Sequence, residues 1–314
     1  MKQTNALARW LDAEVRAFIA RTNDFYPDDA NTGGIAQSRV LYDRLCASFR
    51  ARRPAGVTVV DGSVAAAWGA IPTRRYHPPG AARRAALLYL HGGGFVLGSL
   101  DSHDDVCAEL CHAANTDVVA VDYRLAPEHV YPAALDDVAD VYRALVADGR
   151  PVVVAGDSAG GHLAASLCHR MRRLGERPPR GQVLIYPGLS SDPLRVVGSR
   201  AATAPMLTAA DCAYYRDAFA GGAACLPVDD PEFAPLDDDD FTGLPPAAIF
   251  AAGYDPLCQD AEDYAAVLNA AGVAVTYRCD PGLVHGWLRA RHMSRLAAGA
   301  FAEVARAVVR LAGA

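Results

Sequence analysis

The spacing of hydrophobic positions changes near residue 57, and the change predicts two kinds of structure. Before it, two segments carry apolar residues every three or four positions, which is the period of an amphipathic helix. A polar, turn-rich stretch over residues 23–34 separates them. After residue 57, short β-branched runs alternate with longer segments rich in Ala and Leu. The two helical stripes consist of Leu7, Trp10, Leu11, Val15, Phe18 and Ile19, and of Val40, Leu41, Leu45 and Phe49.

Eight runs from residue 57 onward are short enough and apolar enough to be strands. Helical segments fit between most of them, and this alternation predicts an α/β fold with a mainly parallel sheet covered by helices on both faces. In such open sheets the active site lies beyond the carboxyl ends of the strands. The expected strands are residues 57–60, 64–71, 85–90, 118–122, 152–155, 183–186, 247–251 and 273–278, and the expected helices are residues 101–115, 133–147, 159–174, 260–271 and 292–312.

One long stretch, residues 190–240, breaks the alternation because it contains no evident strand and only one helical pattern, at 209–219. Insertions of this length in an α/β sheet are usually functional lids. We therefore expect this stretch to join the first two helices as a cap over the site. The expected organisation is an N-terminal helical part of the cap at 1–55, a first part of the core at 56–189, a cap insertion at 190–240 and a second part of the core at 241–314.

The most informative local pattern is Gly-Asp-Ser-Ala-Gly at residues 156–160, between a predicted strand and a predicted helix. A turn this sharp crowds the backbone around its central residue, so the residues two before it and two after it must be small. Gly156 and Gly160 meet that need. The pattern predicts a nucleophile elbow that presents the Ser158 hydroxyl at the carboxyl end of a strand, near a helix N-terminus.

Composition narrows the classes of protein that the chain could be. Its 314 residues are 52% hydrophobic and 21% charged, which is typical of a globular protein with a large core. The net charge of −6 argues against a nucleic-acid-binding surface, which would be basic. No apolar run reaches the roughly 18 residues of a membrane span, and the first residues lack the apolar centre of a signal peptide. We therefore expect a cytoplasmic protein without stable membrane insertion.

Two clusters of potential metal ligands have simpler interpretations. His103, Cys107 and Cys111 recur every four residues beside His112, but an amphipathic helix needs apolar residues at this spacing anyway, whereas zinc needs three or four convergent ligands. The four aspartates at residues 237–240 could attract a cation, but we interpret them as a solvated loop or helix start, because their pattern implies no ligand geometry. The eight cysteines contain no Cys-x-x-Cys pair and are expected to be reduced and largely buried. No metal and no organic cofactor are expected.

A serine hydroxyl becomes an effective nucleophile only when a base takes its proton, and that base is usually histidine. In the elbow fold the acid and then the histidine follow the serine along the chain. Five of the nine histidines precede Ser158, and His162 and His169 lie in the helix that leads away from it. Of the remaining pair, His292 begins the last predicted helix, whereas His285 lies in a Pro- and Gly-containing loop just after the last predicted strand. We therefore assign His285 as the base.

The acid that orients this histidine is expected near the end of an earlier strand. Asp255 directly follows the predicted strand at 247–251. Asp260 is the main competitor, but it lies in the first turn of a predicted helix, where the helix dipole favours a carboxylate. Asp192, after the preceding strand, is a weaker alternative. We assign Asp255, whose carboxylate would orient His285 and stabilise the imidazolium.

Acyl transfer also requires hydrogen-bond donors for the developing oxyanion. The sequence His-Gly-Gly-Gly-Phe at residues 91–95 follows a predicted strand, and its glycines allow backbone N–H groups to approach a ligand closely. The amides of Gly93, Gly94 and Ala159 form the expected oxyanion hole, whereas His91 is expected to hold the loop by hydrogen bonds. A merely flexible turn and a phosphate loop are the alternatives, and the second is weakened because no Lys-Ser or Lys-Thr pair follows.

Five motifs follow one another along the chain: His-Gly-Gly-Gly-Phe at 91–95, Tyr-Arg-Leu-Ala-Pro-Glu at 123–128, Gly-Asp-Ser-Ala-Gly-Gly at 156–161, Asp-Pro-Leu at 255–257 and His-Gly at 285–286. In this order they resemble the hormone-sensitive-lipase family of α/β-hydrolase esterases. The resemblance extends from about residue 57 to the C-terminus, and the earlier residues match only in being helical, as the cap of that family is. It implies an α/β-hydrolase fold in which Ser158, Asp255 and His285 are the catalytic triad. Asp157 is similar to the acidic residue before the serine in one branch of the family.

The resemblance also implies an activity: a serine carboxylesterase that hydrolyses short- to medium-chain esters of small molecules through an acyl-enzyme. Homodimers are common among similar enzymes, but no interface is evident in the sequence. An amidase or arylformamidase, a lactonase and a polyester-degrading enzyme with the same triad are alternatives. The family also contains ligand-binding members, the plant gibberellin receptors, which have lost the triad histidine. Here His285 is present.

Overall fold

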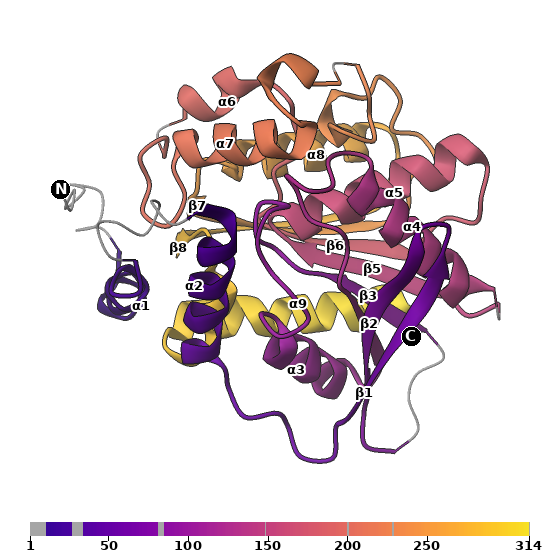
Figure 1. Cartoon of the computed structure of the whole chain (residues 1–314), viewed down its shortest axis with the longest axis horizontal. Coiled ribbons are helices and arrows are strands. Elements are labelled where there is room, and N and C mark those ends of the chain that lie inside the picture. Colours follow the sequence, from indigo (N-terminus) through magenta and orange to yellow (C-terminus); the bar gives the residue numbers. More distant parts are fainter. Residues whose placement is uncertain are drawn as a thin grey trace.

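The chain forms a twisted sheet with helices packed on both of its faces (Figure 1). The structure is a computed structural model and describes residues 11–26, 34–80, 85–147, 149–199, 201–227 and 229–313. Within these ranges, eight strands follow the order β1-β2-β4-β3-β5-β6-β7-β8. Strand β2 pairs antiparallel with β1 and β4, and the other neighbouring strands pair in parallel. The predicted α/β fold with a mainly parallel, eight-stranded sheet is therefore confirmed.

The elements lie close to the predicted ones along most of the chain. The strands are β1 (Thr58–Ala66), β2 (Gly69–His77), β3 (Ala86–Leu90), β4 (Asp117–Val121), β5 (Val152–Asp157), β6 (Gly181–Ile185), β7 (Ala247–Tyr254) and β8 (Val275–Val284). The helices are α1 (Ala13–Asn23), α2 (Gly34–Phe49), α3 (Asp104–Ala114), α4 (Ala133–Val146), α5 (Ala159–Leu174), α6 (Pro193–Val197), α7 (Ala209–Ala220), α8 (Cys258–Ala270) and α9 (Arg295–Gly313), with short 3-10 helices η3 (Ala223–Cys225), η4 (Pro235–Asp237) and η5 (Trp287–His292).

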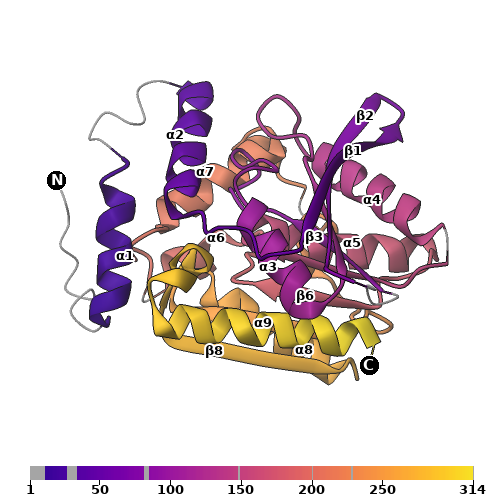
Figure 2. The ribbon, with the colours of Figure 1, turned by 90° about the horizontal axis from the view of Figure 1, so that it is seen from below.

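Two apolar layers, one on each face of the sheet, make up most of the core. Helices α4, α5 and α8 cover one face, and α3 and α9 cover the other (Figures 1 and 2). Strands β3, β5 and β6 are buried along their whole length. Because both faces of these strands meet helices, their sequences are apolar apart from Asp157 and Gln182 and do not alternate with polar residues. The carboxyl ends of these strands therefore provide a rigid base for a site.

The first hairpin differs from the prediction. The predicted strand at 64–71 spans the turn of this hairpin, where the chain reverses at Trp68. The turn lacks the Asn-Gly or Asp-Gly pair that marks a short hairpin in a sequence. The Trp68 Nε1–H donates to Asp137 Oδ1 of α4 at 2.8 Å, and the Arg124 guanidinium lies 4.6 Å above the indole ring. The position of the turn thus depends on a tertiary contact.

The last strand is longer than predicted, because β8 continues through the residues that we expected to form a loop. Pro281 lies inside it. Strand β8 is at the edge of the sheet and pairs only with β7, so a residue without an N–H group is tolerated there. The register between β7 and β8 shifts at Gly253, which lies beside Pro281. A Cβ added to Gly253 would lie 2.6 Å from Pro281 Cα. As a result, His285 follows the strand directly.

Four further helices come from the segments that we expected to form a cap. In Figure 1, α6 and α7 lie above the sheet and α1 and α2 lie at its left-hand end. Helices α2 and α7 meet at Val96 and Leu97, which pack with Tyr42 and Cys46 of α2 and with Tyr215 of α7. Within the described residues, the stretch at 190–240 contains helices and loops and no strand, as predicted.

The first predicted helix is described only in part. Leu7 and Trp10 of its stripe lie outside the described residues, within which α1 begins at Ala13. Val15 and Phe18 are buried, and the Asp12 side chain accepts the Val15 N–H at 2.7 Å as a helix N-cap.

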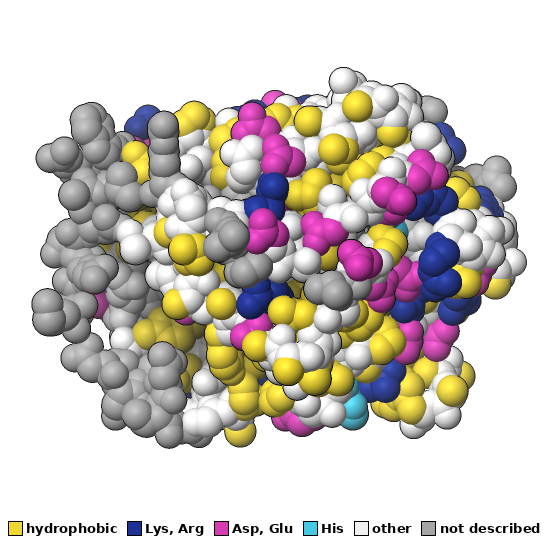
Figure 3. Space-filling view, turned by 90° about the horizontal axis from the view of Figure 1, so that it is seen from above, with side chains coloured by type: hydrophobic (Ala, Val, Ile, Leu, Met, Phe, Trp, Pro, Cys, Tyr) yellow, Lys and Arg dark blue, Asp and Glu magenta, His cyan; other side chains and the backbone are white. Residues whose placement is uncertain are grey.

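The face of the molecule that contains α6 and α7 carries acidic and basic side chains interspersed with apolar ones (Figure 3). Many charged side chains are paired, for example Arg173 with Glu232 and Arg143 with Glu176. Among the helices in the described ranges, none combines the length and the apolar character that crossing a membrane requires.

Candidate active site

The sharp turn between β5 and α5 holds Ser158 in an unusual backbone conformation. Its φ of 53° and ψ of −120° are rare for a residue with a side chain, and such strain costs about 1–3 kcal/mol. The Ser158 N–H donates to Ile185 O of β6 at 2.8 Å. A Cβ on Gly156 would lie 2.3 Å from a Gly160 backbone atom, and one on Gly160 would lie 2.0 Å from Leu90 O. Both flanking positions therefore require glycine.

The side chains of Ser158, His285 and Asp255 form a continuous chain of hydrogen bonds. His285 Nε2 lies 2.9 Å from Ser158 Oγ. His285 Nδ1 lies 2.7 Å from Asp255 Oδ2, and the other carboxylate oxygen accepts the Leu257 N–H at 2.9 Å. With Asp255 ionised, Nδ1 carries the ring proton and Nε2 is free to accept the serine proton.

The parallel sheet explains why these three residues meet. Strands β5, β6, β7 and β8 run in the same direction, so their carboxyl ends lie along one edge of the sheet. Ser158 follows β5, Asp255 follows β7 and His285 follows β8. The structure thus brings together three residues that are up to 127 positions apart in the sequence.

The competing acid and the competing base lie in other environments. Asp260 is buried in the first turn of α8, where it accepts the Leu189 N–H at 2.8 Å and pairs with Arg195 at 3.0 Å. His292 ends η5 and lies 2.9 Å from Glu109 Oε1 at the surface. Neither contacts Ser158 or His285 through a hydrogen bond.

The remaining candidates lie outside the chain of hydrogen bonds that joins Ser158, His285 and Asp255. His162 lies in α5, with Nδ1 2.8 Å from Gly188 O. His169 lies further along α5 and contacts Asp238 Oδ2 at 2.6 Å. Asp192 is exposed, near the start of the stretch at 190–240.

The burial of His162 leads to a testable dependence of stability on pH. Burial lowers the pKa of His162 to about 4 from the ordinary 6.5. The unfolded chain therefore binds this proton more readily than the folded chain, so stability that is present above pH 6.5 is lost as the pH falls towards 4. Between pH 7 and pH 5, we expect His162 to account for a decrease of about 2 kcal/mol in the free energy of unfolding.

Urea unfolding of the wild-type protein and of His162→Gln at these two pH values measures the contribution. The variant should show the shallower decrease, because glutamine does not titrate. Equal decreases in the two proteins would contradict the prediction.

The glycine-rich loop at 91–95 lies beside Ser158 and is tightly folded. Gly93 O accepts the Leu97 N–H at 2.8 Å, and an added Cβ on Gly93 would lie 2.2 Å from Leu97 O. Gly93 and Gly94 have φ angles of 132° and 61°, which favour glycine. The His91 ring makes a hydrogen bond to the loop, with Nδ1 2.9 Å from Gly92 O, and burial lowers its pKa to about 4, so the ring stays neutral.

Asp157 lies buried under this loop and ties it to the elbow. Its Oδ1 accepts the Gly92 N–H at 3.1 Å and the Tyr89 O–H at 2.8 Å, and its Oδ2 accepts the Tyr186 O–H at 3.3 Å. His103 Nε2 lies 3.3 Å away. Burial would raise the pKa of Asp157, but His103 and the Tyr89 hydroxyl hold it well below its usual range. The carboxylate is therefore ionised at neutral pH and keeps accepting these hydrogen bonds.

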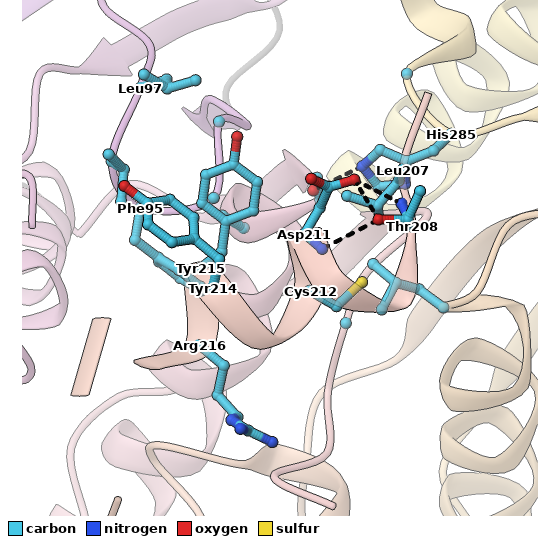
Figure 4. Close-up of a pocket in the computed structure, with 18 of the residues that line it drawn as sticks. Phe95, Leu97, Leu207, Thr208, Asp211, Cys212, Tyr214, Tyr215, Arg216 and His285 are labelled. Carbon is cyan, nitrogen blue, oxygen red and sulfur yellow. Dashed lines mark hydrogen bonds between the residues drawn. The ribbon is translucent and has the colours of Figure 1, made fainter. Parts of the chain in front are cut away.

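A cavity of about 890 Å³ opens over Ser158 between the sheet and helices α2 and α7. Its walls include His285 and the glycine-rich loop. Figure 4 shows Asp211, Cys212 and Tyr215 projecting from α7. A space of this size accommodates a small organic molecule.

A cap stabilises the first turn of α7, and a ring contact holds the helix over this cavity. The Thr208 and Asp211 side chains cap the helix reciprocally, each accepting a backbone N–H of the other at 3.2 and 2.8 Å (Figure 4). The Tyr215 ring packs onto the glycine-rich loop so closely that a Cβ on Gly94 would lie 2.2 Å from a ring carbon. Gly94 is therefore required both by the loop and by α7.

The two clusters of potential metal ligands have other partners. His103 precedes α3 and contacts Asp157, whereas Cys107 and Cys111 are buried in an apolar layer and His112 is exposed. In the part of the chain that the structure describes, no group of three or more His, Cys, Asp or Glu residues could hold a metal ion.

Three of the aspartates at 237–240 are exposed, as expected of a solvated stretch, and only Asp238 is largely covered. Asp238 is nearly buried and pairs with His169 and Arg172. Asp237 accepts hydrogen bonds from the hydroxyl groups of Ser190 and Ser191. The eight cysteines have free thiols, and four of them, Cys46, Cys107, Cys111 and Cys168, are buried.

Sequence reasoning missed most of the groups that surround Asp157. Tyr89 and Tyr186 lie at the ends of otherwise aliphatic strands, and His103 had been considered only as a metal ligand. A tyrosine at the carboxyl end of a buried strand was the one available signal, since its hydroxyl needs a partner there. Arg289 was missed as well, although it lines the cavity.

Comparison with known proteins agrees with this arrangement. Residues 87–289 match a family model described as alpha/beta hydrolase fold. Esterase LipI of Mycobacterium tuberculosis is 41% identical over 240 residues, which cover 73% of this chain and 75% of LipI. The ethyl acetate hydrolase of Pseudomonas putida is 39% identical over 232 residues, covering 70% of this chain and 72% of that enzyme. A crystal structure of an esterase from the bacterial hormone-sensitive lipase family has 26% identity and a TM-score of 0.85, covering 96% of this chain and 99% of that one.

The sheet order, the elbow and the family match define the class of protein, which is an α/β-hydrolase. Within that class, the chain belongs to the hormone-sensitive-lipase family of carboxylesterases. The family resemblance found in the sequence motifs is thereby confirmed.

Proposed function

We propose that this member of the carboxylesterase family hydrolyses small-molecule esters with Ser158 as the nucleophile, His285 as the base and Asp255 as the orienting acid. The observation that carries the proposal is the unbroken hydrogen-bond chain from Ser158 Oγ through the imidazole to Asp255. The Ser158 end of these hydrogen bonds lies in a cavity of substrate size. A nucleophile, a base and an orienting group in such an order are the minimum that acyl transfer requires.

The proposed reaction has two halves. In the first, His285 Nε2 takes the Ser158 proton while Oγ attacks the ester carbonyl, and the imidazolium then protonates the leaving alcohol. Asp255 keeps Nδ1 protonated and stabilises the imidazolium without taking its proton. In the second half, His285 activates a water molecule that attacks the acyl-enzyme, which releases the carboxylic acid and regenerates Ser158.

The amides of Gly93, Gly94 and Ala159 are the proposed donors to the oxyanion. Ala159 is the first residue of α5, so its N–H has no acceptor within the helix and lies at the positive end of the helix dipole. Gly93 and Gly94 line the same cavity, and Asp157 holds their loop through the N–H of the preceding glycine. One such donor contributes a factor of about 10²–10³ to kcat in comparable enzymes.

We further propose that residues 1–55 and 190–240 form a cap that selects the acyl group. Helices α2 and α7, which belong to these two segments, line the cavity from the side opposite the sheet. Phe95 and Phe219 stack with ring centres 3.8 Å apart in the same wall. Stacked aromatic rings in the wall of a cavity of limited volume favour short and medium acyl chains over long ones.

A series of p-nitrophenyl esters from acetate to palmitate tests this preference. We expect kcat/KM to peak at a short or medium chain and to fall by at least about tenfold from that peak to palmitate, because a confined pocket rejects the extra methylene groups. Ser158→Ala protein measured alongside gives the background. Comparable turnover of long-chain emulsions would contradict the proposed preference.

The same assay separates the alternatives. Faster turnover of matched anilides than of esters would favour an amidase, and faster turnover of cyclic esters would favour a lactonase. A protein that binds ligands but shows no serine-dependent turnover on any ester, amide or lactone would be a receptor of the same fold.

We also propose a cytoplasmic location and a homodimer. Free thiols at all eight cysteines agree with a cytoplasmic location, where thiols stay reduced. Strand β8 forms an edge of the sheet, and an edge strand offers unpaired backbone groups through which a homodimer could form.

A further inference from the structure

An arginine side chain enters the cavity close to the proposed catalytic histidine. Arg289 lies in η5, four positions after His285, and both residues line the cavity over Ser158. Its Nη1 would lie 3.6 Å from a Cβ added to Gly286, so the guanidinium is next to the turn that carries His285. A positive charge in a cavity wall needs a partner, because an uncompensated charge away from bulk water is unfavourable.

The described groups that make hydrogen bonds with Arg289 are neutral. Its Nε–H donates to Cys46 Sγ at 3.4 Å, its Nη2 donates to the Tyr42 hydroxyl, and its Cζ lies 4.8 Å from the centre of the Tyr42 ring. Burial raises the pKa of Tyr42 and that of Cys46. The phenol and the thiol therefore stay uncharged at neutral pH and do not act as counter-ions.

Among the residues that the structure describes, no carboxylate forms an ion pair with Arg289. Asp157 acts on it through space, but the oxygens of that carboxylate already serve the hydrogen bonds under the glycine-rich loop. Arg216 provides a contrast within the same cavity wall, because its guanidinium is bound to Asp217 by two hydrogen bonds at 2.8 and 3.1 Å. Within the ranges that the structure describes, Arg289 is thus a cation in the cavity without a carboxylate partner.

We infer that Arg289 binds an anionic group of the substrate and that the enzyme prefers esters that carry a carboxylate in their acyl or alcohol part. This inference rests on the proposed esterase function and specifies the substrate class of the same site. A guanidinium has five N–H donors in a planar fork that matches a carboxylate, and within the described residues only those on Nε and Nη2 have acceptors. A bound carboxylate would provide the missing counter-ion and would orient the ester carbonyl towards Ser158.

Two matched pairs of esters test the inference by changing only the charge. The p-nitrophenyl monoester of adipic acid is compared with p-nitrophenyl methyl adipate, and 3-carboxyphenyl butyrate is compared with 3-carbamoylphenyl butyrate. For at least one pair, Arg289→Met should lower the ratio of kcat/KM, charged over neutral, by about 10- to 100-fold, the range expected for a hydrogen bond to a charged group. Arg289→Lys keeps the charge without the planar fork and should lower the ratio less.

Arg216→Met is the matched control, because it removes a cavity arginine that already has a carboxylate partner. It should change both ratios by less than about twofold. Thermal unfolding of each variant shows whether it is folded. If Arg289→Met does not fold, Arg289→Lys is compared with the wild-type protein in its place.

Binding of adipate to the Ser158→Ala protein, measured by calorimetry, gives a readout that does not depend on turnover. Adding Arg289→Met should weaken the Kd for adipate by at least about tenfold. If adipate binds in this way but no neutral ester is hydrolysed by the wild-type protein, the proposed esterase function fails and the anion site stands. The inference is overturned if neutral esters are hydrolysed and Arg289→Met changes neither the two ester ratios nor the adipate Kd of the Ser158→Ala protein by more than about twofold.

Discussion

Replacing Ser158 with alanine is expected to lower kcat by about 10⁴–10⁶ while leaving the fold intact. The loss is large because Ser158 Oγ, 2.9 Å from His285 Nε2, is the atom that would bond to the acyl group. Without it, only substrate binding and the oxyanion donors remain to assist water. Initial rates with p-nitrophenyl butyrate measure the loss, and circular dichroism with thermal unfolding checks the fold.

Ser166→Ala provides a matched control for this prediction. Ser166 lies in the same helix, about 12 Å further along its axis, and its buried hydroxyl has no hydrogen-bond partner in the described structure. The control should change kcat by less than about threefold, because it removes an unpartnered hydroxyl away from the cavity. A loss in Ser158→Ala of less than about 100-fold would show that another group is the nucleophile.

Replacing Asp255 with asparagine is expected to lower kcat by about 10⁴, a loss similar to or smaller than that of the serine variant. The Asp255 carboxylate lies 2.7 Å from His285 Nδ1 and is almost completely buried. An asparagine has nearly the same shape, but it does not stabilise the imidazolium, and it allows the tautomer in which Nε2 carries the proton. The measurement is kcat with a saturating short-chain ester across the neutral pH range.

The same exchange at Asp260 is the comparison that tests the choice of acid. The Asp260 carboxylate accepts the backbone N–H groups of Leu189 and Ser190 and pairs with Arg195. We therefore expect Asp260→Asn to act mainly on stability and to reduce kcat far less than Asp255→Asn does. If Asp260→Asn proved the more damaging to kcat, the acid would have been assigned to the wrong residue.

Most of the sheet could be predicted because its central strands follow a local rule. Strands β3, β5 and β6 are buried on both faces, so each must be a short apolar run with turn residues on either side. The elbow is equally local, since crowding at Ser158 leaves room only for glycine at Gly156 and Gly160. Such features are visible in a sequence because the residues that cause them are neighbours.

The errors occurred where the deciding contact is distant in the sequence. The turn of the first hairpin is held by Trp68 and Asp137, which are 69 positions apart. Pro281 indicated a loop, yet it lies in a strand because β8 happens to be at the edge of the sheet. Whether a strand lies at an edge depends on the order of all the strands, and no local pattern records that order.

The fold class, the family and a short set of candidates for the chemistry follow from the amino-acid sequence alone, because chain order and local spacing carry that information. The surroundings of those candidates follow from tertiary packing. Asp157 meets the Gly92 N–H across 65 positions, and Arg289 meets the Tyr42 hydroxyl across 247. The physical reason is that such partners are brought together by the packing of strands and helices. The charge of the cavity wall, and with it the substrate class that we infer, is therefore a property of the folded chain.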